Sequence, residues 1–207
     1  MTEYAVLHPR NPQPRTIARA VEVLRDGGVI AYPTDSCYAL GCHIGDKAAM
    51  ERIRRIRDVD ERHHFALVCR DLSELAVYAR VNNQQFRLLK AATPGAYVFI
   101  LEATRELPKR LQHPKRRTIG LRVPDHPVVT ALLGGLGEPI LSSTLILGGD
   151  ELPLADGEAI RERLMNQVDM ILDAGSCGLE PTTVVDLTST TPVLVRAGKG
   201  DLAVLGF

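Results

Sequence analysis

The stretch YPTDSCYALG occupies residues 32–41, and in it a proline directly follows the short apolar run of residues 29–32. An apolar run of this length is typical of a buried strand, and Pro33 ends it because proline has no amide proton to donate to a neighbouring strand. Residues 34–36 then bring three small oxygen-bearing side chains to the strand end. Ligands of α/β proteins bind at such ends, so this segment is a candidate site for a hydroxyl, carboxylate or phosphate group. The alternative is an ordinary turn whose side chains bond to the backbone.

Apolar strands and amphipathic helices alternate on both sides of this stretch. The predicted helices are residues 15–26, a segment capped by Asp46, a segment opened by the capping box of residues 71–74, and residues 83–91, 126–133 and 156–166. Eight strands are predicted, at residues 29–32, 65–69, 97–101, 118–123, 139–147, 170–172, 183–187 and 193–195. Most of these strands are too apolar to face solvent, so helices must cover them. The pattern therefore predicts an α/β fold with a twisted open mixed sheet and flanking helices.

Length and composition predict one soluble domain over residues 1–207. A chain of 207 residues suits a single domain, and 45% hydrophobic residues allow a sizeable core. The four cysteines are irregularly spaced, which indicates reduced thiols and a cytoplasmic location. The first residues contain no apolar signal region, and no run approaches the ~18 apolar residues of a membrane span. We therefore expect no membrane partner.

Charge is unevenly distributed, although the formal net charge is zero. Residues 1–122 contain 21 Lys and Arg against 13 Asp and Glu, whereas residues 123–207 contain 4 against 12. The positive half favours a polyanionic partner such as RNA, with Arg52, Arg55 and Arg116 as contacts. The basic cluster around Arg116 has no aromatic residue for base stacking, which favours contact with the phosphate backbone. The alternative is that the halves attract each other or that a dimer pairs them.

Three further arginines are candidates for binding an anion. Arg57 lies near the C-terminus of a predicted helix, before an irregular segment, and would supply a fork for phosphate. Arg122 and Arg196 each end an apolar strand, where burying a guanidinium group without an anion is costly. We expect ligand roles for both; the alternative is a buried pair with Asp125 or Asp186.

The sequence gives little evidence for a catalytic nucleophile or for a metal site. No motif ties a histidine to Cys37, and the pair Cys42-His43 lacks the spacing of a structural metal site, so no metal site is predicted. His63-His64 is interpreted as a polar loop rather than a catalytic pair. A Walker A loop and a dinucleotide-binding glycine fingerprint are both missing, so a nucleotide must be held by another route.

Five segments, in order along the chain, resemble the motifs of the YrdC-like family. PTDSCYALG resembles the family's PT-[DE]-T-x-Y-G-L-G signature, and Thr93-Pro94-Gly95 resembles its W-P-G-P-x-T segment. IGLRVPDHP, PTTVVDLT and VRAGKG resemble its Arg-x-Pro-x-His-Pro, S-T-V-V-D and Arg-x-Gly segments. The resemblance covers residues 10–200, and RIRDVDERHHFALVCRDLSEL and PILSSTLIL are most similar to the YciO branch.

The resemblance implies a twisted mixed sheet around a large, positively lined concave cavity. It also implies a nucleotidyltransferase reaction in which ATP, L-threonine and bicarbonate form threonylcarbamoyl-adenylate for the modification of adenosine in tRNA. The carbamate of threonine attacks the α-phosphate in line and pyrophosphate leaves, which requires cationic charge and usually Mg²⁺ with the ATP. Water must be excluded, because the carbamate and the mixed anhydride hydrolyse readily.

By the same resemblance, family roles fall on particular residues of this chain. Thr34 and Tyr38 would contact the threonine moiety, and Arg122 would hold a carboxylate or a phosphate. The candidate catalytic residues are Arg57, in place of a phosphate-facing lysine, and Thr144, in place of the serine of a Ser-x-Asn pair. Three residues would close over the nucleotide: Thr182, Thr183 and Arg196.

The chain departs from the family pattern at three positions. The family commonly has a lysine and, two positions on, an arginine, where this chain has Arg57 and Val59. The asparagine of Ser-x-Asn is Ile146, and the threonine of P-G-P-x-T is Val98. Each polar group missing from a dry cavity costs on the order of 2–4 kcal/mol of transition-state stabilisation, so adenylate synthesis should be weak or absent. A different function stays open, in which the cavity binds double-stranded RNA or tRNA without adenylate synthesis.

Overall fold

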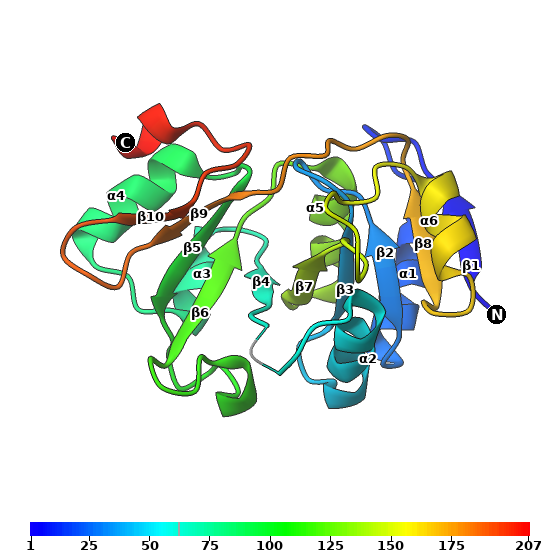
Figure 1. The fold of residues 1–207 in the computed structure, drawn as a ribbon, viewed down its shortest axis with the longest axis horizontal. Helices are drawn as coiled ribbons and strands as arrows, with labels where there is room; N and C mark the ends of the chain where they lie inside the picture. Colours follow the sequence, from blue (N-terminus) through cyan, green and yellow to red (C-terminus); the bar gives the residue numbers. More distant parts are fainter. Residues whose placement is uncertain (62) are drawn as a thin grey trace.

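The computed structural model describes residues 1–61 and 63–207, and one ten-stranded sheet runs through them (Figure 1). Across the sheet the strands are β1 (Glu3–Val6), β8 (Met170–Asp173), β2 (Val29–Tyr32), β3 (Ala39–His43), β7 (Ile140–Thr144), β4 (Ala66–Val68), β6 (Thr118–Arg122), β5 (Tyr97–Glu102), β9 (Thr183–Asp186) and β10 (Val193–Arg196). Strands from the two halves of the sequence are interleaved in this order, so both halves contribute to the same sheet.

The sheet is mixed and open, which confirms the predicted fold class. Parallel pairing joins β1 and β2 to β8, β4 to β6, and β5 to β9. The other neighbours pair antiparallel. β1 and β10 are the two edges, so the sheet does not close into a barrel.

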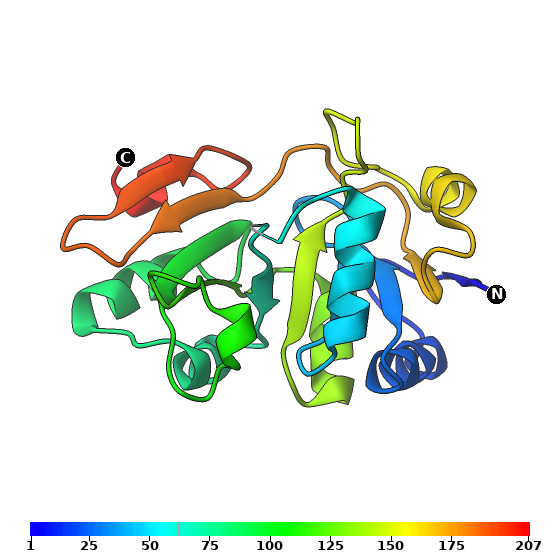
Figure 2. The same cartoon turned by 60° about the horizontal axis from the view of Figure 1, so that its bottom comes forward.

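In the described part of the chain, six α-helices cover the sheet: α1 (Pro14–Arg25), α2 (Lys47–Arg57), α3 (Leu72–Tyr78), α4 (Asn83–Ala92), α5 (Pro127–Leu136) and α6 (Gly157–Leu164). Helices α1 and α5 pack on one face of β2, β3 and β7, together with Ile30 and Tyr32. Helix α2 covers the opposite face, where Val29 and Ala31 point (Figure 2). The alternation of neighbouring residues between the two faces explains why β2 is apolar throughout.

Local interactions fix the helix that carries Arg57. As predicted, Asp46 caps α2: its carboxylate accepts a hydrogen bond from the Ala49 amide at 2.8 Å. Asp58 follows α2 as its C-cap, and its φ of 52° lies in the left-handed region, which stops the helix. Arg57 is therefore the last helical residue, at the point where the chain turns away from the helix axis.

Two strands, β1 and β3, are missing from the sequence prediction, which gives eight strands where the structure has ten. Strand β3 pairs with both β2 and β7, and Gly41 lies at its centre. A Cβ atom on Gly41 would lie 2.7 Å from the Tyr32 ring and 2.8 Å from Ile140, so only glycine fits here. Strand β1 is a four-residue edge strand, and so short a segment carries little periodic signal.

Ion pairs between the two halves of the chain account for part of the uneven charge. Arg52 donates to Asp169 at 2.6 Å, and Arg116 donates to Asp186 at 2.5 Å. Each pair joins the basic first half to the acidic second half. For these two arginines, the ion pairs favour the alternative in which the halves attract each other.

The four cysteines are all free thiols, and Cys37, Cys42 and Cys69 are buried. Three of the four thiols therefore lie in the interior of the fold. Over the described residues, no helix is long and apolar enough to cross a bilayer.

Candidate functional site

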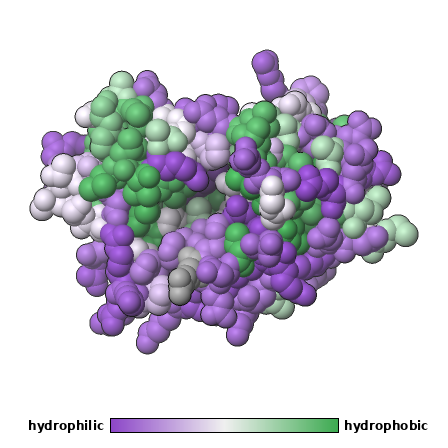
Figure 3. Space-filling model, in the orientation of Figure 1, coloured by the Kyte–Doolittle hydropathy of each residue, from purple (hydrophilic) through white to green (hydrophobic). Residues whose placement is uncertain are grey.

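A cavity of about 660 Å³ lies on the face of the molecule shown in Figure 3. Residues from β3, β4, β5, β6, β7, β9 and β10 line it, together with the end of α2 and the short 3₁₀ helix η1 (Lys109–Leu111). Ligand sites for small molecules have volumes of roughly 300–1,000 Å³. The concave cavity that the family resemblance implies is therefore present, and it is large enough for a nucleotide.

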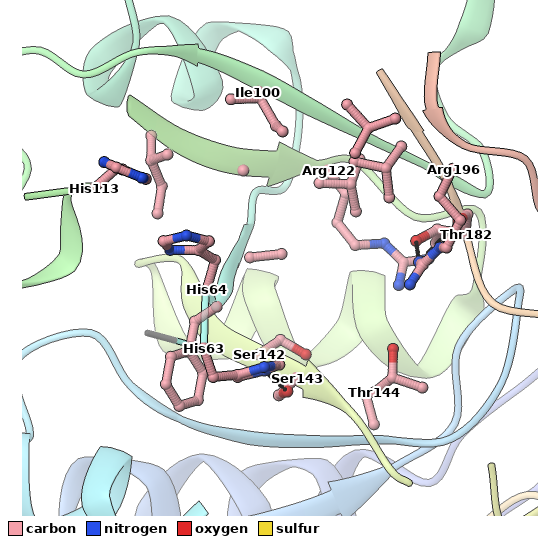
Figure 4. Close-up of a pocket in the computed structure, with 18 of the residues that line it drawn as sticks. His63, His64, Ile100, His113, Arg122, Ser142, Ser143, Thr144, Thr182 and Arg196 are labelled. Carbon is pink, nitrogen blue, oxygen red and sulfur yellow. Dashed lines mark hydrogen bonds between the residues drawn. The ribbon is translucent and has the colours of Figure 1, made fainter. Parts of the chain in front are cut away.

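Two groups of polar side chains mark opposite ends of the cavity, and His63, Ser142, Ser143 and Thr144 lie along its lower wall as drawn (Figure 4). Arg122, Arg196 and Thr182 lie together at one end. His64 and His113 lie at the other end, with their ring centroids 4.9 Å apart. The cavity thus has a guanidinium end and an imidazole end.

At the guanidinium end, Arg122 forms a buried ion pair with Asp35. Only 7% of the Arg122 side chain and 10% of the Asp35 side chain are exposed. Asp35 also accepts a hydrogen bond from the Asp125 amide at 2.9 Å, and its carbonyl accepts one from Lys199 Nζ at 2.6 Å. Arg122 is therefore in a buried ion pair, as the alternative to a ligand role expects, but its partner is Asp35 and not Asp125 or Asp186.

Arg57 is half-buried, and its guanidinium group is held from three sides. Nε donates to the Ile146 carbonyl at 3.2 Å, and Nη1 lies 2.5 Å from Ser143 Oγ and 2.7 Å from His63 Nε2. Arg196 is held differently, because its Nε and Nη2 both donate to the Thr182 carbonyl. Both guanidinium groups line the cavity.

Among residues 1–61 and 63–207, neither Arg57 nor Arg196 forms an ion pair with a carboxylate. Burial lowers the pKa of both groups, and the charge of Arg196 lowers the pKa of Arg57 further. Two positive charges in the wall of one cavity, without a neutralising carboxylate, favour the binding of an anion in that cavity. Arg57, Arg122 and Arg196, the three arginines that the sequence offers as candidates for binding an anion, all line this one cavity.

The Thr34 side chain does not join the arginines in the cavity. It is only 4% exposed, and its Oγ1 donates to the Cys37 carbonyl at 2.7 Å while facing the Ser36 and Cys37 amides. The segment that follows β2 is thus a turn stabilised by its own hydroxyl group, and its neighbour Cys37 is the residue that lines the cavity. The expected contact of Thr34 with a ligand does not fit this arrangement.

Tyr38 lines the cavity with part of its surface, but its hydroxyl group is engaged elsewhere. The hydroxyl donates to the Gly175 carbonyl at 2.8 Å and accepts from the Ala174 amide at 3.2 Å. Burial raises the pKa of Tyr38 well above its usual value. Its hydroxyl therefore ties β3 to the end of β8 rather than pointing at a ligand.

The three threonines of the sequence prediction have different environments. Thr144, at the end of β7, and Thr182, before β9, both line the cavity. Thr183 is fully buried, and its Oγ1 donates to the Gly200 carbonyl at 2.7 Å. Thr183 therefore holds the segment after β10 in place and does not line the cavity itself.

The three arginines predicted to contact RNA do not form a common surface. Arg52 lies outside the cavity and reaches the Gln167 carbonyl as well as Asp169. Arg116 lines the cavity, where Asp186 and Thr188 accept from its Nη2. Arg55 is exposed on α2. Each of the three side chains thus faces different surroundings.

Two polar residues of the cavity, His63 and Ser143, are not among the sequence-predicted site residues. His63 is interpreted from the sequence as part of a polar loop, yet its Nε2 lies 2.8 Å from Ser143 Oγ. Burial lowers the pKa of His63 to about 4, with a further contribution from the charge of Arg57. The sequence offers no local signal for this cluster, because Ser143 lies on β7, far along the chain from His63.

Two of the three departures from the family pattern face the cavity. Val98 and Ile146 both line it. Both positions therefore present methyl groups where the family pattern has a hydroxyl and an amide. Val59, the third departure, is not among the residues that line the cavity.

Comparison with known proteins adds relatives that cover nearly the whole chain. The family model Sua5_yciO_yrdC, described as telomere recombination, matches residues 22–198. YciO of Escherichia coli strain K12 is 56% identical over 202 residues, which are 98% of each chain. A threonylcarbamoyl-AMP synthase of Stenotrophomonas maltophilia is 33% identical over 178 residues, which are 84% of this chain and 95% of that protein.

Solved structures show the same fold. The crystal structure of E. coli YciO superposes with a TM-score of 0.95 and 56% identity, covering 99% of both chains. Sua5 of P. abyssi complexed with L-threonine has a TM-score of 0.87 at 24% identity, covering 95% of this chain and 58% of that one. The fold, the cavity and these matches lead to one conclusion: the chain belongs to the Sua5/YciO/YrdC family.

Proposed function

We propose that the chain binds ATP in this cavity and condenses it, slowly, with L-threonine and bicarbonate to give threonylcarbamoyl-adenylate. The observation that carries the proposal is the pair Arg57 and Arg196, which share the cavity without a carboxylate partner in the described part of the chain. The relatedness to a protein named threonylcarbamoyl-AMP synthase supports the choice of reaction. A cytoplasmic location and a role in tRNA modification follow from the same proposal.

In the proposed reaction, the amine of threonine first condenses with bicarbonate to give the carbamate N-carboxy-threonine, and one water molecule leaves. An oxygen of the carbamate group, not of the α-carboxylate, then attacks the α-phosphorus of ATP. A new P–O bond forms, the bond to the oxygen bridging the α- and β-phosphorus breaks, and pyrophosphate leaves with that oxygen. Arg57 and Arg196 would hold phosphate oxygens, because a guanidinium group offers a planar fork of donors. Thr144 and Thr182 would donate from their hydroxyl groups, and both line the cavity.

Mg²⁺ would enter with the ATP rather than reside in the protein. Within the described residues, no group of three His, Cys, Asp or Glu side chains is placed to hold a metal ion. Asp186 lines the cavity, but Arg116 and Thr188 already engage its carboxylate. The donors present fit an ion held mainly by phosphate oxygens and water, which is the usual arrangement for Mg²⁺.

The low rate follows from the apolar residues at Val98 and Ile146. Methyl groups at these positions cannot donate to a developing charge on the phosphate. A missing donor of this kind costs about a hundredfold or more in rate. Arg57 retains the positive charge of the lysine that it replaces in the family pattern. The departures from the pattern would therefore weaken ATP binding less than they lower the rate of adenylate synthesis.

The reaction is tested by measuring pyrophosphate release from ATP with and without threonine and bicarbonate. We expect slow release that requires both co-substrates and is abolished in Arg57→Ala. Release that continues unchanged when threonine is omitted would contradict the proposal.

A second candidate function is binding of double-stranded RNA or tRNA without adenylate synthesis. One observation favours it: several basic residues around η1, beside the mouth of the cavity, are exposed, namely Arg105, Lys109, Arg110, Lys115 and Arg117. Binding through phosphate contacts weakens steeply with salt, and each neutralised contact lowers the slope by about one. Affinity that does not change with salt would exclude this function.

A further inference from the structure

His63 Nε2, Ser143 Oγ and Arg57 Nη1 form a closed triangle at the wall of the cavity. The three distances are 2.7 Å from Arg57 to His63, 2.5 Å from Arg57 to Ser143, and 2.8 Å from His63 to Ser143. Figure 4 shows His63 and Ser143 next to each other on the lower wall of the cavity as drawn. His63 comes from the segment between α2 and β4, and Ser143 from β7.

The triangle defines which nitrogen of His63 carries a proton. A guanidinium group has only N–H donors and stays charged, so it cannot accept a hydrogen bond. Two N–H groups facing each other at 2.7 Å would repel, so His63 Nε2 must be the acceptor. The imidazole is therefore neutral, with its proton on Nδ1.

The surroundings of His63 also disfavour a charged imidazole. The charges of Arg57 and Arg54, both on α2, and of His64 disfavour the protonated ring, whereas Asp60 favours it. Burial and the arginine charges lower the pKa of His63 to about 4. At neutral pH the imidazole keeps the lone pair that Arg57 uses.

We propose that His63 is a positioning residue, which fixes the guanidinium group of Arg57 in the cavity by accepting its Nη1–H at an unprotonated Nε2. With the Ile146 carbonyl and Ser143, it holds Arg57 through Nε and Nη1. Removal of the imidazole makes the long Arg57 side chain more mobile. Binding an anion then has to order this side chain, and the lost conformational entropy weakens binding. The inference rests on the proposed function only in that Arg57 contacts the phosphates of ATP.

ATP affinity, measured by calorimetry, tests the positioning role. We expect His63→Ala to weaken ATP binding about tenfold, and His63→Gln to stay within about threefold of wild type because its amide oxygen is an acceptor of similar reach. The double variant Arg57→Ala/His63→Ala should bind no more weakly than Arg57→Ala, since His63 acts through Arg57. Additive losses in the double variant, or wild-type affinity in His63→Ala, would overturn the inference. His8→Ala, an exposed histidine outside the cavity, is the matched control.

The protonation state is tested separately by nitrogen NMR of the His63 ring in the unliganded protein. We expect an unprotonated Nε2 and a protonated Nδ1 from about pH 5.5 to 8, and no titration near the ordinary histidine pKa of about 6.5. A protonated Nε2 at about pH 7 would refute the inference whatever the outcome with ATP. If wild type fails to bind ATP while the NMR result holds, the proposed function fails and the Arg57–His63 contact stands.

Discussion

Arg57 and Arg196 line the same cavity, and the charge of Arg196 lowers the pKa of Arg57, after the larger effect of burial. The two residues come from α2 and β10, far apart in the chain, and both guanidinium groups line the same cavity. A bound anion would offset both the burial of Arg57 and its repulsion by Arg196. Its negative charge neutralises the two guanidinium groups, and its oxygens replace the water that they have lost. The relationship is the physical basis for a phosphate site.

Arg57→Ala and Arg196→Ala should each weaken ATP binding by about ten- to a hundredfold. Hydrogen bonds to charged groups are worth about 1.5–3 kcal/mol, which corresponds to this range. Calorimetric titration with ATP measures the change. Arg55→Ala is the control for the same helix, since Arg55 is exposed and outside the cavity, whereas Arg54 lies over the Phe65 ring and supports packing. A change of less than twofold in both cavity variants would contradict the anion site.

Asp35→Ala should destabilise the protein by about 3–5 kcal/mol, because it leaves the buried Arg122 charge without its partner. The double variant Asp35→Ala/Arg122→Met should recover part of this loss, since the unpaired charge is gone. Urea denaturation measures both. The pair between Arg163 and Asp150, whose side chains are 46% and 27% exposed, is the control, and Asp150→Ala should cost about 1 kcal/mol or less. Equal effects of Asp35→Ala and Asp150→Ala would show that burial of the first pair has no energetic consequence.

Ile146→Asn combined with Val98→Thr should raise threonine-dependent pyrophosphate release by at least about tenfold. The two substitutions return an amide and a hydroxyl group to a wall that now presents methyl groups to the ligand. Val195→Thr is a matched control, because it adds a hydroxyl group elsewhere on the cavity wall. If the control raises release as much as the double variant, the methyl groups of Val98 and Ile146 are not the cause of low activity.

The cysteines should react slowly with iodoacetamide in the folded protein. Burial raises the pKa of the Cys37 thiol, raises that of Cys177 to about 11, and raises that of Cys42 to about 12. The thiolate is the reactive form, so at about pH 8 each thiol should label far more slowly than free cysteine. Mass spectrometry after timed labelling measures the rates. ATP should protect Cys37, which lines the cavity, more than Cys177, which does not; rapid labelling of Cys37 in the presence of ATP would argue against occupancy of this cavity.

Local sequence signals predict most of the elements, and long-range contacts explain the rest. The Asp46 cap and the apolar run of β2 are local, and the structure has both. Strand β3 is not predicted because its residues follow directly on the turn after β2 and do not stand out as a separate strand. Its pairing with β7 depends on a segment far along the chain. The same limit applies at the site. The position of Arg122 at a strand end predicts that it faces a ligand cavity, but no local sequence signal identifies Asp35 as its ion-pair partner. The contact between His63 and Ser143 is likewise invisible in the sequence, because it joins residues far apart in the chain.

The most direct test of the central claim is a crystal structure after soaking with ATP, L-threonine and bicarbonate. We predict density for phosphate groups between the guanidinium groups of Arg57 and Arg196, inside the cavity that both residues line. Phosphate density outside this cavity, or a ligand within it that contacts neither arginine, would contradict the anion site on which the proposed function rests.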